Sequence, residues 1–339
     1  MIPQEKSAAV TRALREAFGV TTFEDIQTLT KGHSSALVFR IIVRGSPFLL
    51  RIIMRIDSTT ERHFACMRAA ADAGLAPRVW YTSVEDRISI TDFVEAVPFP
   101  VTEALVRMPA TLRALHALPP FPRAENHLNT TCMFLINKGA ALDGFIQRFQ
   151  TAKILPNAES EELFARYAQV AAVYPLHDPD MVSSHNDLKP ENILFDGGRV
   201  WLVDWEAAFL NDRYADLAVV ANYLVTNDAE QKLYLREYVG QSPDPYQLAR
   251  FFLMQQVVHI FYAMVYLLLG SSGKPVSLSE QAPGFKAFCR RIWAGEIDLE
   301  NNDAKIVYGK THLEQLLQNT RRAEFNEALR VVSDRHARP

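Results

Sequence analysis

One stretch near the middle of the chain restricts its possible folds and functions more than any other. His185 is followed by Asp187 two residues later, and Asn192 comes five residues after that aspartate. A turn at residues 196–198 and a β-rich run then lead to Asp204. An acid that can orient a hydroxyl, followed by an amide oxygen and a second acid that can hold magnesium, is the layout of a phosphoryl-transfer site.

The alternative is that these are ordinary turn residues, because Asn and Asp are frequent in turns. Chance would rarely also supply the upstream histidine, the hairpin and the acid that ends its second strand. We therefore expect Asp187 to be catalytic, and Asn192 and Asp204 to bind a metal ion. His185 is expected to brace the loop rather than to react.

The segment from His185 to Leu194 resembles the catalytic loop of the protein-kinase-like superfamily. Its continuation, Val203 to Phe209 with Asp212 and Asp216 beyond, is similar to the small-molecule branch, which contains choline and ethanolamine kinases and aminoglycoside phosphotransferases. A protein kinase would carry Asp-Phe-Gly at residues 204–206, where this chain has Asp-Trp-Glu. A protein substrate is therefore disfavoured.

The resemblance implies an α+β, bilobal protein-kinase-like fold. A small N-terminal lobe with an antiparallel sheet is expected over residues 1–92 and would bind the nucleotide. A larger, mainly helical lobe is expected over residues 93–339 and would hold the catalytic loop and the substrate. The expected co-substrate is ATP and the expected cofactor is Mg²⁺, with Asp187 orienting the substrate hydroxyl.

Periodicity and breaker residues predict the elements around the central stretch. Strands are expected over residues 26–29, 37–43, 48–54 and 88–95, and helices over residues 3–18, 58–73, 102–118, 142–154 and 160–173. Beyond Asp216 the chain is expected to be almost wholly helical. The apolar run from Phe251 to Gly270 carries two glutamines and a histidine, so a buried core helix is expected there rather than a membrane span.

Composition excludes several other classes of protein. The chain has 339 residues, of which 48% are apolar and 22% charged, as expected for a packed core. A formal net charge of −3 leaves no basic surface for nucleic acid. Three scattered cysteines indicate neither a disulfide framework nor a zinc cluster, and the polar N-terminus does not read as a signal peptide. We therefore expect a cytoplasmic protein.

Two N-terminal features are expected to contact the nucleotide phosphates. The small-residue loop with Gly32, Ser34 and Ser35 follows a predicted strand, where backbone N–H groups can approach phosphate. An ordinary hairpin turn is the alternative. Arg51 is a charge inside an apolar strand, and buried arginines are rare unless they are paired. The resemblance places a Lys or Arg that contacts the phosphates at this point.

Three further positions are expected to serve the nucleotide. Glu61 is a candidate partner for Arg51, but it also stands three residues after Ser58, which is a capping-box spacing. The register leaves open that the position of the usual family acid falls near His63. By resemblance to the segment that joins the two lobes, the backbone near Asp92 and Val94 is expected to bond the adenine edge.

The identity of the acceptor molecule is what the sequence determines least. Candidate substrate-binding residues are Lys189, Trp205, Glu206 and Asp216, supported by nearby aromatic residues. Lys189 is equally well explained as a solvated lysine, and Trp205 and Asp216 as core and bracing residues. A cationic amino alcohol such as choline or ethanolamine is expected, because aromatic rings and carboxylates together bind such cations. An aminoglycoside, or a pseudokinase that binds nucleotide and docks a partner, is the alternative.

Overall fold

The computed structural model describes residues 2–29, 36–55, 59–123, 140–175, 181–279 and 281–336; side chains within residues 140–145 are not described. The chain divides into two compact units. Met1–Val97 and Glu191–Phe209 form the first unit, and Pro98–Pro190 and Leu210–Pro339 form the second. The segment 191–209 therefore packs with the N-terminal unit, although it follows the first boundary by almost a hundred residues. A single domain boundary near residue 92 stays a prediction.

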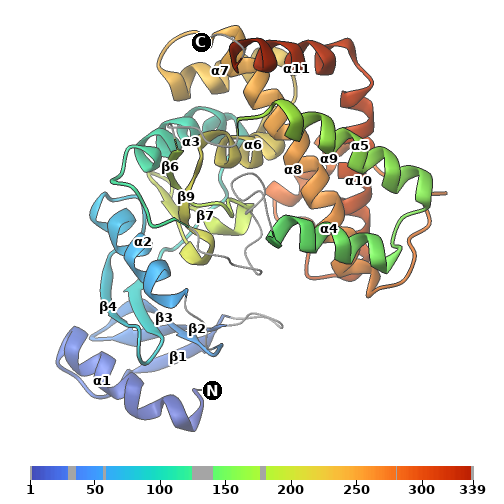
Figure 1. The fold of residues 1–339 in the computed structure, drawn as a ribbon. Helices are drawn as coiled ribbons and strands as arrows, with labels where there is room; N and C mark the ends of the chain where they lie inside the picture. Colours follow the sequence, from blue (N-terminus) through green and yellow to red (C-terminus); the bar gives the residue numbers. More distant parts are fainter. Residues whose placement is uncertain are drawn as a thin grey trace. The chain divides into compact units, whose positions relative to one another are not determined.

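The first unit is built on a five-stranded antiparallel sheet with strand order β1-β2-β3-β5-β4 (Figure 1). The strands are β1 (Asp25–Thr28), β2 (Ala36–Val43), β3 (Ser46–Ile53), β4 (Val79–Ser83) and β5 (Ile88–Asp92). Four of them lie where the sequence predicts strands, whereas β4 was not predicted. Its five residues are all half-buried, so it lacks the strict alternation of apolar and polar side chains that marks a strand.

Buried and partly exposed side chains alternate along β2 and β3, which gives the sheet two different faces. Phe39, Ile41, Leu50 and Ile52 are buried and pack with apolar residues of α1 (Ser7–Phe18). The intervening side chains point to the opposite face, because successive residues of a strand face opposite ways. Register places Val38, Arg51 and Ser89 in one row across three strands of that second face.

Two further elements complete the first unit. Helix α2 (Thr60–Asp72) ends before Gly74, which adopts the left-handed conformation with φ of 71°. The hairpin of β7 (Ile193–Phe195) and β8 (Val200–Leu202) is joined to the segment after α2 through the backbone, because Leu202 N–H donates to the carbonyl of Leu75 at 2.8 Å. The N–H of Val97 donates to the carbonyl of Phe195 at 2.7 Å.

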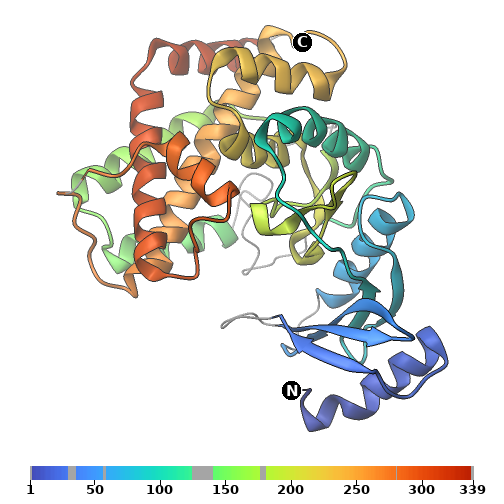
Figure 2. The same ribbon diagram turned by 180° about the vertical axis from the view of Figure 1, so that it is seen from behind.

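The second unit is mainly helical (Figures 1 and 2). Its one short sheet pairs β6 (Met181–Ser184) with β9 (Phe209–Asp212), as far as the described residues show. Neither strand was predicted. The helices are α3 (Val101–His116), α4 (Ala140–Ala152), α5 (Asn157–Val173), α6 (Arg213–Leu224), α7 (Asp228–Val239), α8 (Pro245–Ser271), α9 (Phe285–Trp293), α10 (Asn302–Thr320) and α11 (Ala323–His336).

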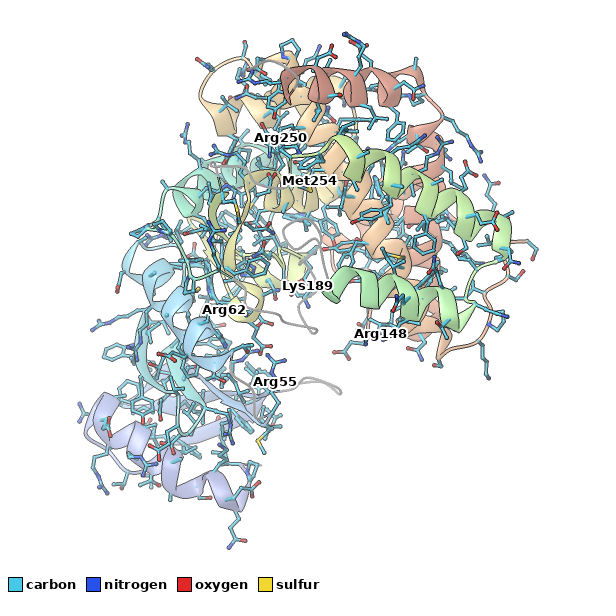
Figure 3. All side chains as sticks on the ribbon, viewed as in Figure 1. Arg55, Arg62, Arg148, Lys189, Arg250 and Met254 are labelled. Carbon is cyan, nitrogen blue, oxygen red and sulfur yellow. The ribbon has the colours of Figure 1, made fainter. Side chains whose placement is uncertain are left out.

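Helix α8 is the centre of the second unit. Helices α6, α10 and α11 pack against it, and Figure 3 shows Arg250 and Met254 on it among the surrounding side chains. A helix that is apolar on all sides is either buried in a core or spans a membrane. This is the one helix among the described residues long and apolar enough to span, and 78% of its apolar window is buried within the protein. The prediction of a core helix is confirmed.

Two histidines face each other in this core. His259 of α8 and His312 of α10 lie with their Nδ1 atoms 2.9 Å apart, so one Nδ1 carries a proton and donates it to the other. Burial lowers the pKa of His259 to about 3 and lowers the pKa of His312 well below its ordinary value. Both rings are therefore neutral in the folded protein at pH 7.

This pair should make the fold sensitive to mild acid. The unfolded chain protonates both histidines near their ordinary pKa of 6.5, whereas the folded chain does not, so stability falls as pH decreases through that value. We expect the free energy of unfolding to drop by about 1.4 kcal/mol per histidine between about pH 7.5 and 5.5. Urea unfolding at several pH values measures this, and His312→Gln should halve the drop. An unchanged pH slope in that variant would contradict the assignment.

Candidate active site

The β7–β8 hairpin brings the two predicted metal ligands to one end. Asp196 closes its turn, because its Oδ1 accepts the N–H groups of Gly198 at 2.9 Å and Arg199 at 2.7 Å. Hydrogen bonds from the Trp201 indole, Gly198 and Arg199 hold the pKa of Asp196 below its usual value.

At the open end of the hairpin, Val203 N–H donates to the carbonyl of Asn192 at 3.0 Å. Asn192 and Asp204 therefore flank the paired ends of the two strands.

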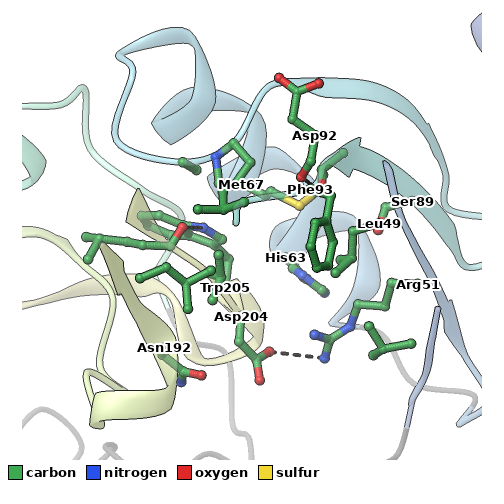
Figure 4. Close-up of a pocket in the computed structure, with 18 residues that line it drawn as sticks. Leu49, Arg51, His63, Met67, Ser89, Asp92, Phe93, Asn192, Asp204 and Trp205 are labelled. Atoms are coloured by element: carbon green, nitrogen blue, oxygen red, sulfur yellow. Dashed lines mark hydrogen bonds and ion pairs between the residues drawn. The ribbon is translucent and has the colours of Figure 1, made fainter. Parts of the chain in front are cut away.

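A pocket of about 230 Å³ lies within the first unit (Figure 4). Much of its wall is apolar and comes from the second face of the sheet, from α2 and from the hairpin, with Val38, Leu49, Met67, Leu194 and Leu202 among the lining residues. Asp92 and Phe93 stand at one end, and Arg51, Asn192 and Asp204 stand at the other. An apolar slot with charges at one end suits a flat aromatic ring that carries an anionic tail.

Asp92 and Val94, the predicted adenine-binding positions, both line the pocket, but they differ in the hydrogen bonds that they already make within the protein. The N–H of Asp92 already donates to the carbonyl of Arg78 at 2.9 Å, and its carboxylate accepts the indole N–H of Trp80 at 2.6 Å. Val94 makes no hydrogen bond within the part of the chain that the structure describes. The backbone of Val94 is therefore the better candidate for the adenine edge, and the side chain of Asp92 has a structural partner.

Arg51 provides the positive charge of the pocket. Its guanidinium is 3.0 Å from Asp204 Oδ1 and also contacts the carboxylate of Glu206, and its side chain is only 14% exposed. Burial by itself would lower the pKa of Arg51, but the charges of Asp204 and Glu206 raise the pKa above its ordinary value. Asp204 adopts the left-handed backbone conformation, with φ of 66°, which is unusual for a residue other than glycine.

The partner of Arg51 differs from the predicted one. Glu61 is exposed on the first turn of α2, and the ion pairs of Arg51 are with Asp204 and Glu206 instead. His63 is buried and lines the pocket. Two residues along an α-helix turn the side chain by about 200°, so Glu61 and His63 cannot face the same side. Gly32, Ser34 and Ser35 lie outside the described residues.

The loop around Asp187 is anchored from beneath by Asp216. Its two carboxylate oxygens accept the backbone N–H groups of His185 and Asn186, each at 2.8 Å, and Oδ2 is also 3.2 Å from His116 Nε2. Burial would raise the pKa of Asp216, but the bonds and charges of His116 and His185 lower it below its usual value. Asp187 itself keeps 20% of its side chain exposed, with Lys189 Nζ 3.5 Å from its Oδ2.

Three of the four predicted substrate-binding residues already have partners within the protein. Asp216 is fully buried beneath the loop, and Trp205 is 1% exposed, with its indole N–H donating to the carbonyl of Leu202. Glu206 is held between the guanidinium groups of Arg51 and Arg55. Trp205 also lines the pocket and Glu206 keeps 19% of its side chain exposed, so substrate binding by these residues stays a prediction. Lys189, which is 37% exposed beside Asp187, stays a prediction.

Asn192 and Asp204 fit a magnesium site. Both line the pocket and both supply the oxygen ligands that Mg²⁺ prefers, and Mg²⁺ is usually held by few protein oxygens together with substrate phosphates. No cluster of three His, Cys, Asp or Glu side chains able to hold a metal occurs among the described residues. Two oxygen donors at the charged end of the pocket suit a magnesium ion that arrives with a nucleotide.

Comparison with protein families matches residues 25–251 to the model described as "Phosphotransferase enzyme family". This chain belongs to that family. The prediction of a phosphotransferase enzyme is thereby confirmed. A comparison with curated protein sequences finds no match.

Solved structures show which fold this phosphotransferase has. A choline/ethanolamine kinase family protein from Mesorhizobium loti is 19% identical, with a TM-score of 0.66, and the match covers 97% of this chain and 99% of that one. The choline kinase LicA from Streptococcus pneumoniae is 13% identical, with a TM-score of 0.56 and coverage of 93% and 99%. A spectinomycin phosphotransferase is 15% identical, with a TM-score of 0.52 and coverage of 90% and 98%. The expected kinase-like fold is confirmed.

Proposed function

We propose that this phosphotransferase transfers the γ-phosphate of ATP, with Mg²⁺, to a hydroxyl group of a small molecule. The observation that carries the proposal is the pocket in which Arg51, Asn192 and Asp204 stand at one end of an apolar slot. The slot fits an adenine ring, and the charged end fits polyphosphate and magnesium. A location in the cytoplasm remains part of the prediction.

In the proposed reaction, Asp187 accepts or orients the proton of the acceptor hydroxyl, and Lys189 is placed to neutralise charge on the transferred group. Arg51 neutralises nucleotide phosphate. Asn192 and Asp204 would hold the magnesium ion, which when bound neutralises charge on the phosphate oxygens. Asn192 follows Asp187 by five residues, so the chain itself keeps the proton acceptor within about 18 Å of the first magnesium ligand.

The acceptor that we propose is a choline-like or ethanolamine-like amino alcohol. Support comes from the similar choline and ethanolamine kinase structures, whose matches cover nearly the whole chain. Glu206 and Asp216 add no support to this class, because arginines and the backbone of the catalytic loop already contact their carboxylates. ATP consumption measured with amino alcohols, aminoglycosides and sugars decides the class. Turnover of aminoglycosides alone would overturn the amino-alcohol assignment.

Magnesium and ATP should bind together and raise thermal stability. A ligand at a hundredfold excess over its dissociation constant stabilises the folded state by about 2.7 kcal/mol. Melting scans with ATP, magnesium and both should show the largest shift with both present. Asp204→Asn should lose more of the magnesium dependence than Asp187→Asn, because only Asp204 lines the pocket. Equal losses in the two variants would mean that the roles of these residues are confused.

A further inference from the structure

We infer that Arg51 and Arg55 together form the polyphosphate site of this pocket, and that Glu206 is the positioning residue that holds both guanidinium groups. The inference rests on the proposed binding of ATP and extends it to two residues, Arg55 and Glu206, for which the sequence indicated no phosphate-binding role. The carboxylate of Glu206 contacts both arginines.

Glu206 joins the two arginines directly. Its Oε1 contacts the guanidinium of Arg51, and its Oε2 is 2.8 Å from Nη2 of Arg55. Arg51 lines the pocket, so Arg55 is linked through the single carboxylate of Glu206 to a residue of the pocket wall. Figure 3 shows Arg55 at the border of the first unit, and its side chain is 36% exposed. A ligand that reaches Arg51 therefore comes close to a second, accessible guanidinium.

The charges around Glu206 favour an anion. Three guanidinium groups lie at Glu206: those of Arg51 and Arg55 contact its carboxylate, and that of Arg62 contacts its backbone carbonyl. Planar guanidinium groups bind phosphate oxygens in pairs, which suits them to a chain of phosphates. One guanidinium could meet one phosphate group, whereas two adjacent guanidinium groups can span neighbouring phosphates.

Glu206 is itself fixed in place. It lies in the short 3-10 turn at Trp205–Ala207, which packs against α2, and its backbone carbonyl accepts the guanidinium of Arg62 at 3.2 Å. Free arginine side chains have many rotamers and lose that entropy on binding. Holding two of them in advance reduces the entropy that the nucleotide must overcome.

A second anchor on Arg51 is needed because its other partner is a predicted metal ligand. Asp204 cannot hold the guanidinium at full strength while it also binds a cation. The Glu206 carboxylate accepts a hydrogen bond from the same guanidinium and keeps Arg51 oriented whether or not Asp204 binds a cation. Helix α2 presents His63 rather than an acid to the pocket, so the anchoring acid comes from the segment after Asp204.

Four variants test the inference by calorimetric binding of Mg-ATP, ADP and adenosine. Arg55→Gln should weaken ATP and ADP binding by about tenfold, as expected for one lost charged hydrogen-bond donor, and leave adenosine binding unchanged. Arg68→Gln, an exposed arginine of α2, is the matched control and should change nothing. Glu206→Gln should also weaken ATP binding by about tenfold.

The Glu206→Gln variant distinguishes a role of Glu206 in positioning the two arginines from an effect of its negative charge alone. Removal of a negative charge alone would tighten ATP binding, whereas loss of the anchor weakens it. Retained adenosine affinity shows that the pocket is still folded, and if Glu206→Gln does not fold, Arg55→Gln decides the inference. Tighter ATP binding by Glu206→Gln, wild-type ATP binding by Arg55→Gln, or weakening by Glu61→Gln in place of Glu206→Gln would overturn it. If the unmodified protein binds neither ATP nor adenosine, the proposed function itself fails.

Discussion

Replacing Asp187 by asparagine should lower the rate of phosphoryl transfer by about 10²–10⁴-fold while nucleotide affinity changes little. Asparagine has nearly the same size but cannot accept the proton of the acceptor hydroxyl. The loop should keep its shape, because Asp216 anchors it. The Asp216 carboxylate accepts the backbone N–H groups of His185 and Asn186, and these bonds do not involve the Asp187 side chain.

The measurement is ATP consumption with the best acceptor found by screening, together with calorimetric titration of Mg-ATP. Asp228→Asn, at an exposed position on the first turn of α7, is a matched control and should keep full activity. A rate for Asp187→Asn within about threefold of the unmodified enzyme would show that proton transfer or orientation by this residue is not needed, since general acid–base groups contribute far more than this.

The second large effect concerns stability. Arg250 of α8 and Asp212 form a buried ion pair, with both side chains about 5–6% exposed. Asp212 also accepts the hydroxyl of Tyr174 at 3.1 Å and caps α6 through the N–H of Tyr214 at 2.8 Å. The guanidinium lies 4.9 Å from the ring centre of Tyr214. Arg250 is labelled on α8 in Figure 3.

Arg250→Met should lower the free energy of unfolding by about 3–5 kcal/mol, because it leaves the carboxylate of Asp212 buried without its cation. Arg321→Met removes an ion pair with Glu162 in which Arg321 is 61% exposed, and should cost less than about 1 kcal/mol. Urea unfolding of both variants measures the difference. Adding Asp212→Asn to Arg250→Met should restore part of the loss, because asparagine is neutral and still caps a helix. Equal losses for Arg250→Met and Arg321→Met would refute the buried-pair assignment.

Local patterns predicted the parts of the fold that depend on neighbouring residues. The turn at Asp196, the left-handed Gly74 at the end of α2 and the apolar run of α8 each appear where the sequence placed them. These features follow from backbone conformation and periodicity over a few residues. The strands β4, β6 and β9 were missed because they are short and their burial does not alternate clearly.

The pairing of charges could not be predicted in the same way. Arg51 and Glu206 are 155 positions apart in the chain, and Asp216 reaches the loop from 31 positions beyond His185. Composition near Asp204 suggested a cage for a cation, whereas the structure neutralises Glu206 with arginines and buries Asp216 beneath backbone N–H groups. The type of a charged residue and its spacing from its neighbours do not show which distant residue will form an ion pair or hydrogen bond with it.

By itself, the sequence determined the phosphotransferase family and the catalytic-loop pattern, and it predicted roles for Asp187, Asn192 and Asp204, because these depend on residue types at short spacing. Only the tertiary structure decided that Asn192 and Asp204 line one pocket with Arg51, and that Asp204 and Glu206 rather than Glu61 pair with that arginine. The physical reason is that an ion pair depends on distance in space. Sheet register and helix rotation set that distance, and neither is encoded in any single local segment.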